Sequence, residues 1–245
     1  MSWRVLFVSL LPLIQAATCY DIVREYSGQT FFDRWDFYGS WDNLTLGDVW
    51  WLDQNTASQQ RLAYIDNNGR AVMRVDNTTT VANNDKRNSV RITSQDSYGA
   101  GSLWIADITH LPWGCSVWPA FWTKGPTWPD NGEIDIIEAV NVHPLSPPSP
   151  LSACANPAPS QLMGNNQYAL HTTPGCVFTE GAVQTGRQQG TKDCSQGSGC
   201  VVAETKPNSF NAGFNDAGGG VWATQFDVEG VLCVTRLYAS YCLIG

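Results

Sequence analysis

Charged residues are scarce in this chain. Only 15% of its 245 residues are charged, and the formal net charge is −8, whereas roughly a quarter of residues are charged in typical proteins. Binding to nucleic acid needs clustered Lys and Arg side chains that neutralise phosphates. The composition therefore excludes nucleic acid as the expected partner and favours an extracellular protein that acts on a neutral polymer.

Several chemical motifs are missing altogether. The chain has three histidines and neither a Cys-x-x-Cys nor a His-x-x-x-His pattern, so we expect no zinc site. It has no Gly-x-Ser-x-Gly nucleophile elbow, which removes the simplest serine hydrolase class. The run 218–220 is three glycines with no Gly-Lys-Ser/Thr after it, so it predicts a flexible turn rather than a phosphate-binding loop.

No apolar run is long enough to span a membrane. The N-terminus instead has the pattern of a signal peptide, with Arg4 before an apolar stretch over 5–14 and small residues at Ala16 and Ala17. We therefore expect residues 1–17 to be removed and the mature chain to be secreted, without a membrane span.

Eight cysteines in a secreted chain indicate disulfides. Cys194 and Cys200 lie in a Gly/Ser-rich loop, and Cys176 is nearby, but the spacing leaves the connectivity open. Asn43-Leu44-Thr45 and Asn77-Thr78-Thr79 match the short N-glycosylation motif.

Short strands separated by Gly, Pro and Asn turns dominate the pattern, and no stretch keeps a helical period over three turns. Asn68-Gly69 predicts a tight hairpin, since this pair tolerates positive φ. The pattern favours an all-β sandwich, with strands expected over residues 61–65, 71–76, 90–93, 102–108, 117–122, 133–140, 168–171 and 221–228.

The most informative run is 132–138, Gly-Glu-Ile-Asp-Ile-Ile-Glu. Glu133 and Asp135 are two residues apart, so a regular strand points both to one face. Glu138 is five residues from Glu133 and would point to the opposite face. One extra residue accommodated as a β-bulge near Ile136 and Ile137 returns it to the face of the other two, and bulges of this kind occur beside active sites.

Three acids on one face suit cleavage of a sugar chain. A retaining glycosidase uses one carboxylate as nucleophile and a second carboxyl group as acid and then base, about 5 Å apart. Crowded like charges raise the pKa of one member and keep a proton available for the leaving oxygen. The alternative interpretation is a solvated acidic strand face or a calcium site.

The segments Trp118-Pro119-Ala120-Phe121-Trp122 and 131–141 (Asn-Gly-Glu-Ile-Asp-Ile-Ile-Glu-Ala-Val-Asn) resemble the signature of fungal glycoside hydrolase family 16, in particular its laminarinase-type endo-β-1,3(4)-glucanases. Residues 88–91 and 111–115 fit the same subgroup. The resemblance implies Glu133 as nucleophile, Asp135 as its assisting acid and Glu138 as acid/base. It also implies a concanavalin A-like jelly roll of two curved antiparallel sheets, with the substrate cleft on the concave side.

Tryptophans cluster just before the acids, at positions 113, 118, 122 and 128. Aromatic faces stack on sugar rings, but large aromatics are also ordinary core material. The resemblance favours Trp122 and Trp113 near the sugar and places His171 on a strand beside the catalytic one. The substrate-binding candidates are Trp113, Trp118, Trp122, Asn141, His171 and Arg91.

Two segments depart from the family pattern. Residues 142–161 are rich in Pro, Ser and Ala and compose like a linker; we hypothesise translated intron sequence, and an evolved loop insertion is the alternative. Residues 229–245 form an atypical tail that resembles nothing in the family. We therefore expect a catalytic domain over 18–228 that is C-terminally incomplete, with unpaired sheet edges, uncovered apolar faces and weak activity.

The expected function is a secreted, retaining endo-β-glucanase that hydrolyses β-1,3 or mixed β-1,3/1,4 glucan, as a monomer and without a metal or other cofactor. Two alternatives remain. A transglycosylase on cell-wall glucan would use the same acids, and a truncated, non-catalytic module would bind glucan without cleaving it. The sequence leaves the linkage preference open.

Overall fold

The computed structural model describes residues 20–114, 116–140, 165–181, 184–228 and 230–237. The expected signal peptide, the segment 142–161 and Asn141 lie outside these residues. The helical elements are η1 (Gly28–Arg34), α1 (Gln54–Gln59) and α2 (Asn211–Asp216). The strands are β1 (Trp35–Phe37), β2 (Val49–Trp51), β3 (Ala63–Ile65), β4 (Ala71–Met73), β5 (Arg87–Ser89), β6 (Ile92–Ser94), β7 (Ser102–Ile108), β8 (Ala120–Lys124), β9 (Glu133–Glu138), β10 (Gln167–His171), β11 (Arg187–Gln189), β12 (Cys200–Ala203), β13 (Gly220–Asp227) and β14 (Gly230–Leu237).

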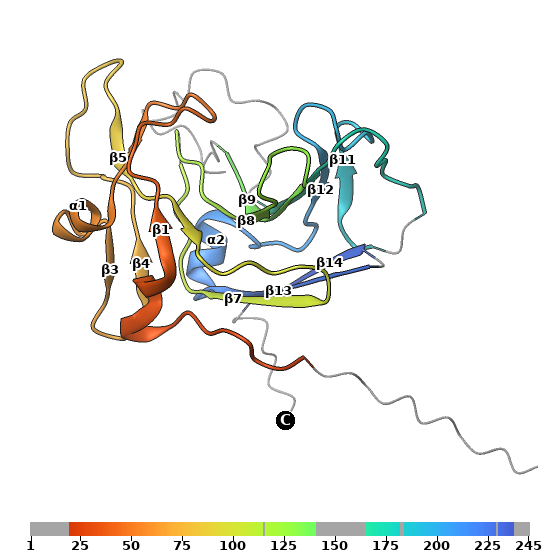
Figure 1. The fold of residues 1–245 in the computed structure, drawn as a ribbon, viewed down its shortest axis with the longest axis horizontal. Helices are drawn as coiled ribbons and strands as arrows, with labels where there is room; N and C mark the ends of the chain where they lie inside the picture. The colour runs from red at the N-terminus through yellow and green to blue at the C-terminus, as the bar shows by residue number, and fades with distance from the viewer. Residues whose placement is uncertain (1–19, 115, 141–164, 182–183, 229, 238–245) are drawn as a thin grey trace, which may run out of the picture.

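Two antiparallel sheets form the body of the molecule. One has five strands in the order β11-β12-β10-β9-β8, and the other has three in the order β14-β13-β7. Figure 1 shows the five-stranded sheet on one side and β7, β13 and β14 on the other. The sandwich expected from the short, turn-separated strands is present over the described residues.

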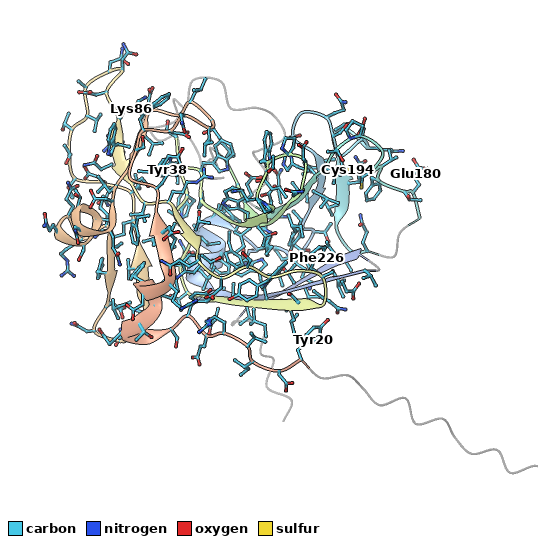
Figure 2. The ribbon with its side chains drawn as sticks, in the orientation of Figure 1. Tyr20, Tyr38, Lys86, Glu180, Cys194 and Phe226 are labelled. Atoms are coloured by element: carbon cyan, nitrogen blue, oxygen red, sulfur yellow. A yellow bond between two sulfur atoms is a disulfide. The ribbon has the colours of Figure 1, made fainter. Side chains whose placement is uncertain are left out.

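The main core lies between these sheets. Ile134, Ile136 and Ile137 of β9 pack there with Phe214 of α2 and Trp222 of β13. Ile136, Ile137 and Phe214 have no exposed surface, and burying each such side chain stabilises the fold by about 1.5–3 kcal/mol. Trp104 and Phe226 stack at the edge of this core, where Figure 2 labels Phe226. The catalytic candidate strand is therefore anchored by its isoleucines.

A smaller core supports the N-terminal part of the chain. Leu52, Ala57, Leu62 and Ala63 are buried together, with Phe32, Phe37 and Val90 packed on them. The hairpin predicted from Asn68-Gly69 is confirmed, because β3 and β4 pair antiparallel and Gly69 has φ +77°. Beside it, β2 and β5 form a parallel pair.

Two strand predictions need correction. Of the strand predicted over 90–93, only Ile92 and Thr93 lie in a strand, β6, which pairs with β1. Val90 and Arg91 lie between β5 and β6. The strand predicted over 117–122 begins only at Ala120. The turn around Ser116, whose φ is +57°, keeps Trp118 outside the strand. Trp118 and Trp122 therefore do not lie on one regular strand.

The segment expected to be an atypical tail contributes a strand. β14 pairs with β13 residue for residue, from Asp227 with Gly230 to Gly220 with Leu237. The buried Thr235 also meets the Tyr168 hydroxyl of β10, so β14 is tied to the other sheet. The physical reason is the β-branched residues of this strand, which fit a half-buried pleat.

β14 is an edge of its sheet within the described residues. Val234 and Ile105 are both paired with Ala223, so they share one face of the sheet, and they are half to two-thirds exposed. This row is an exposed apolar surface of the described residues. None of the helices described here is long and apolar enough to cross a membrane.

Candidate active site

The bulge predicted in β9 is confirmed by the register of both neighbouring strands. On the β8 side, Phe121 pairs with Ile137 and the next residue, Trp122, pairs with Asp135, which skips Ile136. On the β10 side, Gln167 pairs with Glu138 while Ala169 pairs with Asp135. Two residues of β9 thus oppose one residue of each neighbour, which is the definition of a bulge.

The bulge decides which way the acids point. Ile134, Ile136 and Ile137 all enter the main core, so the two adjacent isoleucines share a side that strict alternation would deny them. The charges of Glu133 and Glu138 both interact with those of Asp135 and His171. The three acids are therefore gathered on the face of β9 that lies away from the isoleucines.

A residue that the sequence does not single out satisfies the backbone of the bulge. Asn166 is completely buried. Its Nδ2 donates to the Ile136 carbonyl at 2.8 Å, and its Oδ1 accepts from the Glu138 backbone N–H at 3.1 Å. Its own N–H donates to Ser209 Oγ at 3.0 Å. A bulge leaves ladder groups unpaired, and this carboxamide pairs two of them.

Glu138 is surrounded by groups that favour its neutral form. Burial and the negative charge of Asp135 raise its pKa from the ordinary 4.5 to about 7. Trp118 Nε1 opposes them by donating to Glu138 Oε1 at 2.7 Å, since a hydrogen bond to the carboxylate favours the charged form. A carboxyl group with this pKa holds a proton over much of the acidic to neutral range.

Glu133 has a different partner. Burial and the charge of Asp135 raise its pKa, whereas a hydrogen bond from Trp128 Nε1 and the charge of His171 lower it. The sequence analysis notes Trp128 in the tryptophan cluster but does not include it among the binding candidates. Its position in the loop that ends at Gly132, directly before β9, is the sequence feature that could have indicated this contact.

His171 joins the acids from β10. Its Nε2 lies 3.3 Å from Asp135 Oδ2, and Asp135 is only 3% exposed. This contact, followed by the charges of Glu133 and Glu138, raises the pKa of the imidazole despite its burial. When it is protonated, the imidazole of His171 places a positive charge among the three carboxyl groups.

Arg91 reaches the same region from the segment between β5 and β6. Its guanidinium lies over the ring of Trp122, 5.0 Å from the centroid, and 5.4 Å from that of Tyr38. Burial lowers its pKa, while the charges of Asp42 and Glu133 act in the opposite direction. Arg91 and Trp122 therefore lie near the acids of β9.

The other candidates are distributed differently. Trp118 is half exposed beside Glu138, which fits a group that contacts a ligand. Trp113 packs partly buried against the main core, so it contributes to packing. Asn141 lies outside the described residues.

A disulfide joins Cys194 and Cys200 across the Gly/Ser-rich loop, and Figure 2 labels Cys194 among the loops beside β11 and β12. Cys176 and Cys233 are free thiols in the structure. Over the described part of the chain, no three His, Cys, Asp or Glu side chains are grouped so as to hold a metal ion.

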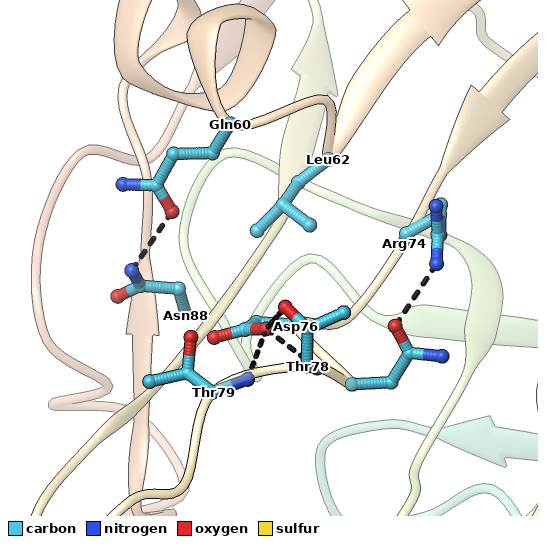
Figure 3. A pocket seen from close by; sticks show the side chains of 8 residues that line it. Gln60, Leu62, Arg74, Asp76, Thr78, Thr79 and Asn88 are labelled. Atoms are coloured by element: carbon cyan, nitrogen blue, oxygen red, sulfur yellow. Dashed lines mark hydrogen bonds between the residues drawn. The ribbon is translucent and has the colours of Figure 1, made fainter.

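A separate pocket of about 400 Å³ lies on the N-terminal part of the molecule (Figure 3). Its lining is polar, and Asn88 donates to Gln60 at one side while Arg74 donates to Asn77 at the other. None of the three acids lines it, so it is distinct from the β9 site. The lining residues are Gln60, Leu62, Arg74, Asp76, Asn77, Thr78, Thr79 and Asn88.

This chain is similar to proteins of a known family. The profile of the XgeA-like catalytic GH16 domain matches residues 35–146 and 160–234. The chain is 36% identical to a probable endo-1,3(4)-β-glucanase of Aspergillus niger over 239 residues, which are 94% of this chain and 29% of that protein. It spans less than half the length of each curated relative compared here.

Two solved structures resemble the fold. An elongating GH family 16 β-1,3-glucosyltransferase superposes with a TM-score of 0.73 at 35% identity, over 88% of this chain and 66% of the other. GH16 laminarinase 16A from Phanerochaete chrysosporium, which holds β-glucans in donor and acceptor sites, superposes with a TM-score of 0.72 at 30% identity, over 86% of this chain and 65% of the other.

The profile match ends at residue 234, inside β14, and omits 147–159, within the segment expected to be an insertion.

Proposed function

Because the chain belongs to the XgeA-like endo-1,3(4)-β-glucanase family of GH16, as its motifs predict, we propose that it hydrolyses β-1,3 or mixed β-1,3/1,4 glucan within the polymer and retains the anomeric configuration. Its substrate is a neutral β-glucan. The likeness to laminarinase 16A and the two antiparallel sheets support a concanavalin A-like jelly roll as the fold that carries this activity.

The observation that carries the proposal is the bulge at Ile136 and Ile137. It brings Glu138 to the face occupied by Glu133 and Asp135. Without it, the two glutamates would point to opposite faces of β9 and could not act on one bond. The energetic support for this geometry is the burial of the isoleucines on the other side.

The proposed reaction is a double displacement. The Glu133 carboxylate attacks the anomeric carbon, while Glu138 transfers its proton to the glycosidic oxygen as the bond to the leaving sugar breaks. The Glu138 carboxylate then takes a proton from water, whose oxygen attacks the anomeric carbon and releases Glu133. The pKa of about 7 for Glu138 supports the first role, because the group must begin protonated.

The surrounding groups support the same assignment. Trp128 Nε1 donates to the Glu133 carboxylate and so favours its charged, nucleophilic form. Asp135 and His171 lie 3.3 Å apart beside both glutamates. Arg91 stacked on Trp122 offers donors and an aromatic face to the hydroxyl groups and rings of the glucan.

The test is a Glu133→Gln variant. It should lose at least about a thousandfold in turnover of laminarin while it still sediments with insoluble glucan, because the side chain keeps its size. The matched control is Glu180→Gln, which changes an exposed glutamate paired with Lys192 and should keep full activity. Near-normal turnover by Glu133→Gln would reject the assignment of the nucleophile.

Transglycosylation is the second candidate, and the similarity to the elongating glucosyltransferase favours it. In that reaction a second sugar replaces water as the acceptor in the second step, with the same acids. Products should be analysed after incubation of laminarin-type oligosaccharides with and without added acceptor. Products longer than the starting oligosaccharide would assign transfer, and shorter products alone would assign hydrolysis.

We also propose that the chain is exported. The signal-peptide pattern of residues 1–17 and the disulfide between Cys194 and Cys200 support this, because disulfides persist in oxidising compartments. N-terminal sequencing of protein recovered from the culture medium should show cleavage near Ala17. An intact N-terminus on cell-retained protein would contradict export.

A further inference from the structure

The loop closed by the Cys194–Cys200 disulfide lies against the end of β10, where His171 is found. Cys200 opens β12 and pairs with Leu170, directly before His171. On the other side, the Thr172 backbone N–H donates to the Cys194 carbonyl at 3.1 Å. The two ends of the loop, joined by their disulfide, therefore hold the residues on both sides of His171.

Gly199 is the point of closest approach. Its φ is +72°, and a Cβ at this position would lie 2.6 Å from the Leu170 carbonyl oxygen and 3.1 Å from Cγ and Nδ1 of His171. Its N–H donates to the Gln196 carbonyl at 2.8 Å, which closes the turn. Only glycine meets both the backbone conformation and the space.

The imidazole is thereby confined between two contacts. A side chain on Gly199 would crowd the Cγ and Nδ1 edge, so this edge faces the loop, and Nε2 faces Asp135 Oδ2 at 3.3 Å. The side chain of His171 is 19% exposed, so little room remains for it to turn away. The disulfide loop and the catalytic candidate strand thus meet through one side chain.

We propose that Gly199, within the Cys194–Cys200 loop, is a positioning residue that holds the His171 cation against Asp135 and so sets the pH range in which Glu133 and Glu138 act. The inference rests on the proposed glucanase function. Gly199 itself touches neither glutamate in this arrangement and acts through His171.

The electrostatic consequence has a definite sign. The ionisable groups that face His171 are Asp135, Glu133 and Glu138, all on β9. The imidazolium lowers the pKa of both glutamates. If the imidazolium moves away, the pKa values of both glutamates rise. The acid limb of the pH profile reports the nucleophile and the alkaline limb reports the proton donor, so both limbs move to higher pH.

The test is Gly199→Ala, with kcat and kcat/KM measured on laminarin across pH 4–9. We expect kcat to fall about tenfold. The whole bell-shaped profile of kcat/KM against pH should move to higher pH by about half a unit. The matched control is Gly197→Ala in the same loop. Gly197 also has a positive φ, +50°, but a Cβ there meets nothing within 4 Å, so the backbone strain is comparable and the profile should stay in place.

Two further measurements keep the inference open to refutation. If Gly199→Ala does not fold, the double variant Cys194→Ser/Cys200→Ser releases the loop without adding an atom and should move the profile in the same direction. NMR titration of His171, one of three histidines, needs no turnover; its pKa should fall toward 6.5 in either variant and stay raised in Gly197→Ala.

The outcomes separate the two proposals. A parent protein that cleaves no glucan but whose His171 responds as expected would refute the glucanase function and support the positioning role. A folded Gly199→Ala variant with an unmoved profile and an unmoved His171 titration would overturn the positioning role and leave the function standing.

Discussion

Replacement of Trp118 by phenylalanine should extend activity to higher pH. In the parent, Trp118 Nε1 donates to Glu138 Oε1 at 2.7 Å, and this bond favours the carboxylate. Phenylalanine keeps the aromatic face and removes the donor. The neutral acid then becomes relatively more stable, so the pKa of Glu138 rises above its value of about 7.

The size of the change follows from the bond. A hydrogen bond to a charged group is worth about 2 kcal/mol, but Trp118 is 51% exposed, so water replaces part of the lost bond and about 1 kcal/mol remains. Since one pKa unit corresponds to about 1.4 kcal/mol, we expect a rise of about 0.7 unit. The alkaline limb of kcat/KM, which reports loss of the Glu138 proton, should move upward by that amount.

The assay is reducing-sugar release from laminarin across pH 4–9, with Trp128→Phe as the paired variant. Trp128 donates to Glu133 rather than to Glu138, so its loss should raise the acid limb and narrow the profile, whereas loss of the Trp118 donor should widen it. An alkaline limb that stays in place or falls in Trp118→Phe would refute the assignment of Glu138 as the proton donor.

Two further predictions concern stability. Burial raises the pKa of Glu138 from 4.5 to about 7, so the stability that this group contributes is complete below pH 4.5 and is lost as pH rises through 7. Glu138→Gln should therefore be inactive yet about 3 kcal/mol more stable than the parent in urea unfolding at pH 8. An equal difference at pH 4 would contradict this. Asn166→Ala leaves the Ile136 carbonyl and the Glu138 N–H unpaired in the interior, so it should cost about 2–4 kcal/mol and lower kcat by at least tenfold in the folded protein. Asn165→Ala, which removes only a bond to the Glu204 carbonyl, should keep kcat, and a folded Asn166→Ala with normal kcat would show that the bulge does not depend on this side chain.

Much of β9, the candidate catalytic strand, could be predicted from local pattern. The alternation of acids and isoleucines over 132–138 predicts a strand, and the position of Glu138 out of phase with Glu133 predicts the bulge that the register confirms. The hairpin at Asn68-Gly69 follows for the same reason. Strand period and turn chemistry are properties of neighbouring residues, and they can be read without knowledge of the fold.

The partners of those acids could not be predicted in this way. Asn166 is 28 residues from Glu138 along the chain, and Trp118 reaches the same glutamate from outside β8. β14 needed β13 beside it before its residues could be recognised as a strand. Each of these contacts depends on how separate segments pack.

The sequence by itself determined that three acids share one strand and made them the candidates for the chemistry, because both inferences need only the residue types and a period of two. The tertiary structure decided how each acid is held: a buried amide at the bulge, an indole N–H on each glutamate and a glycine behind His171. Hydrogen bonds and burial between distant segments set the protonation of a carboxyl group, and no local pattern encodes them.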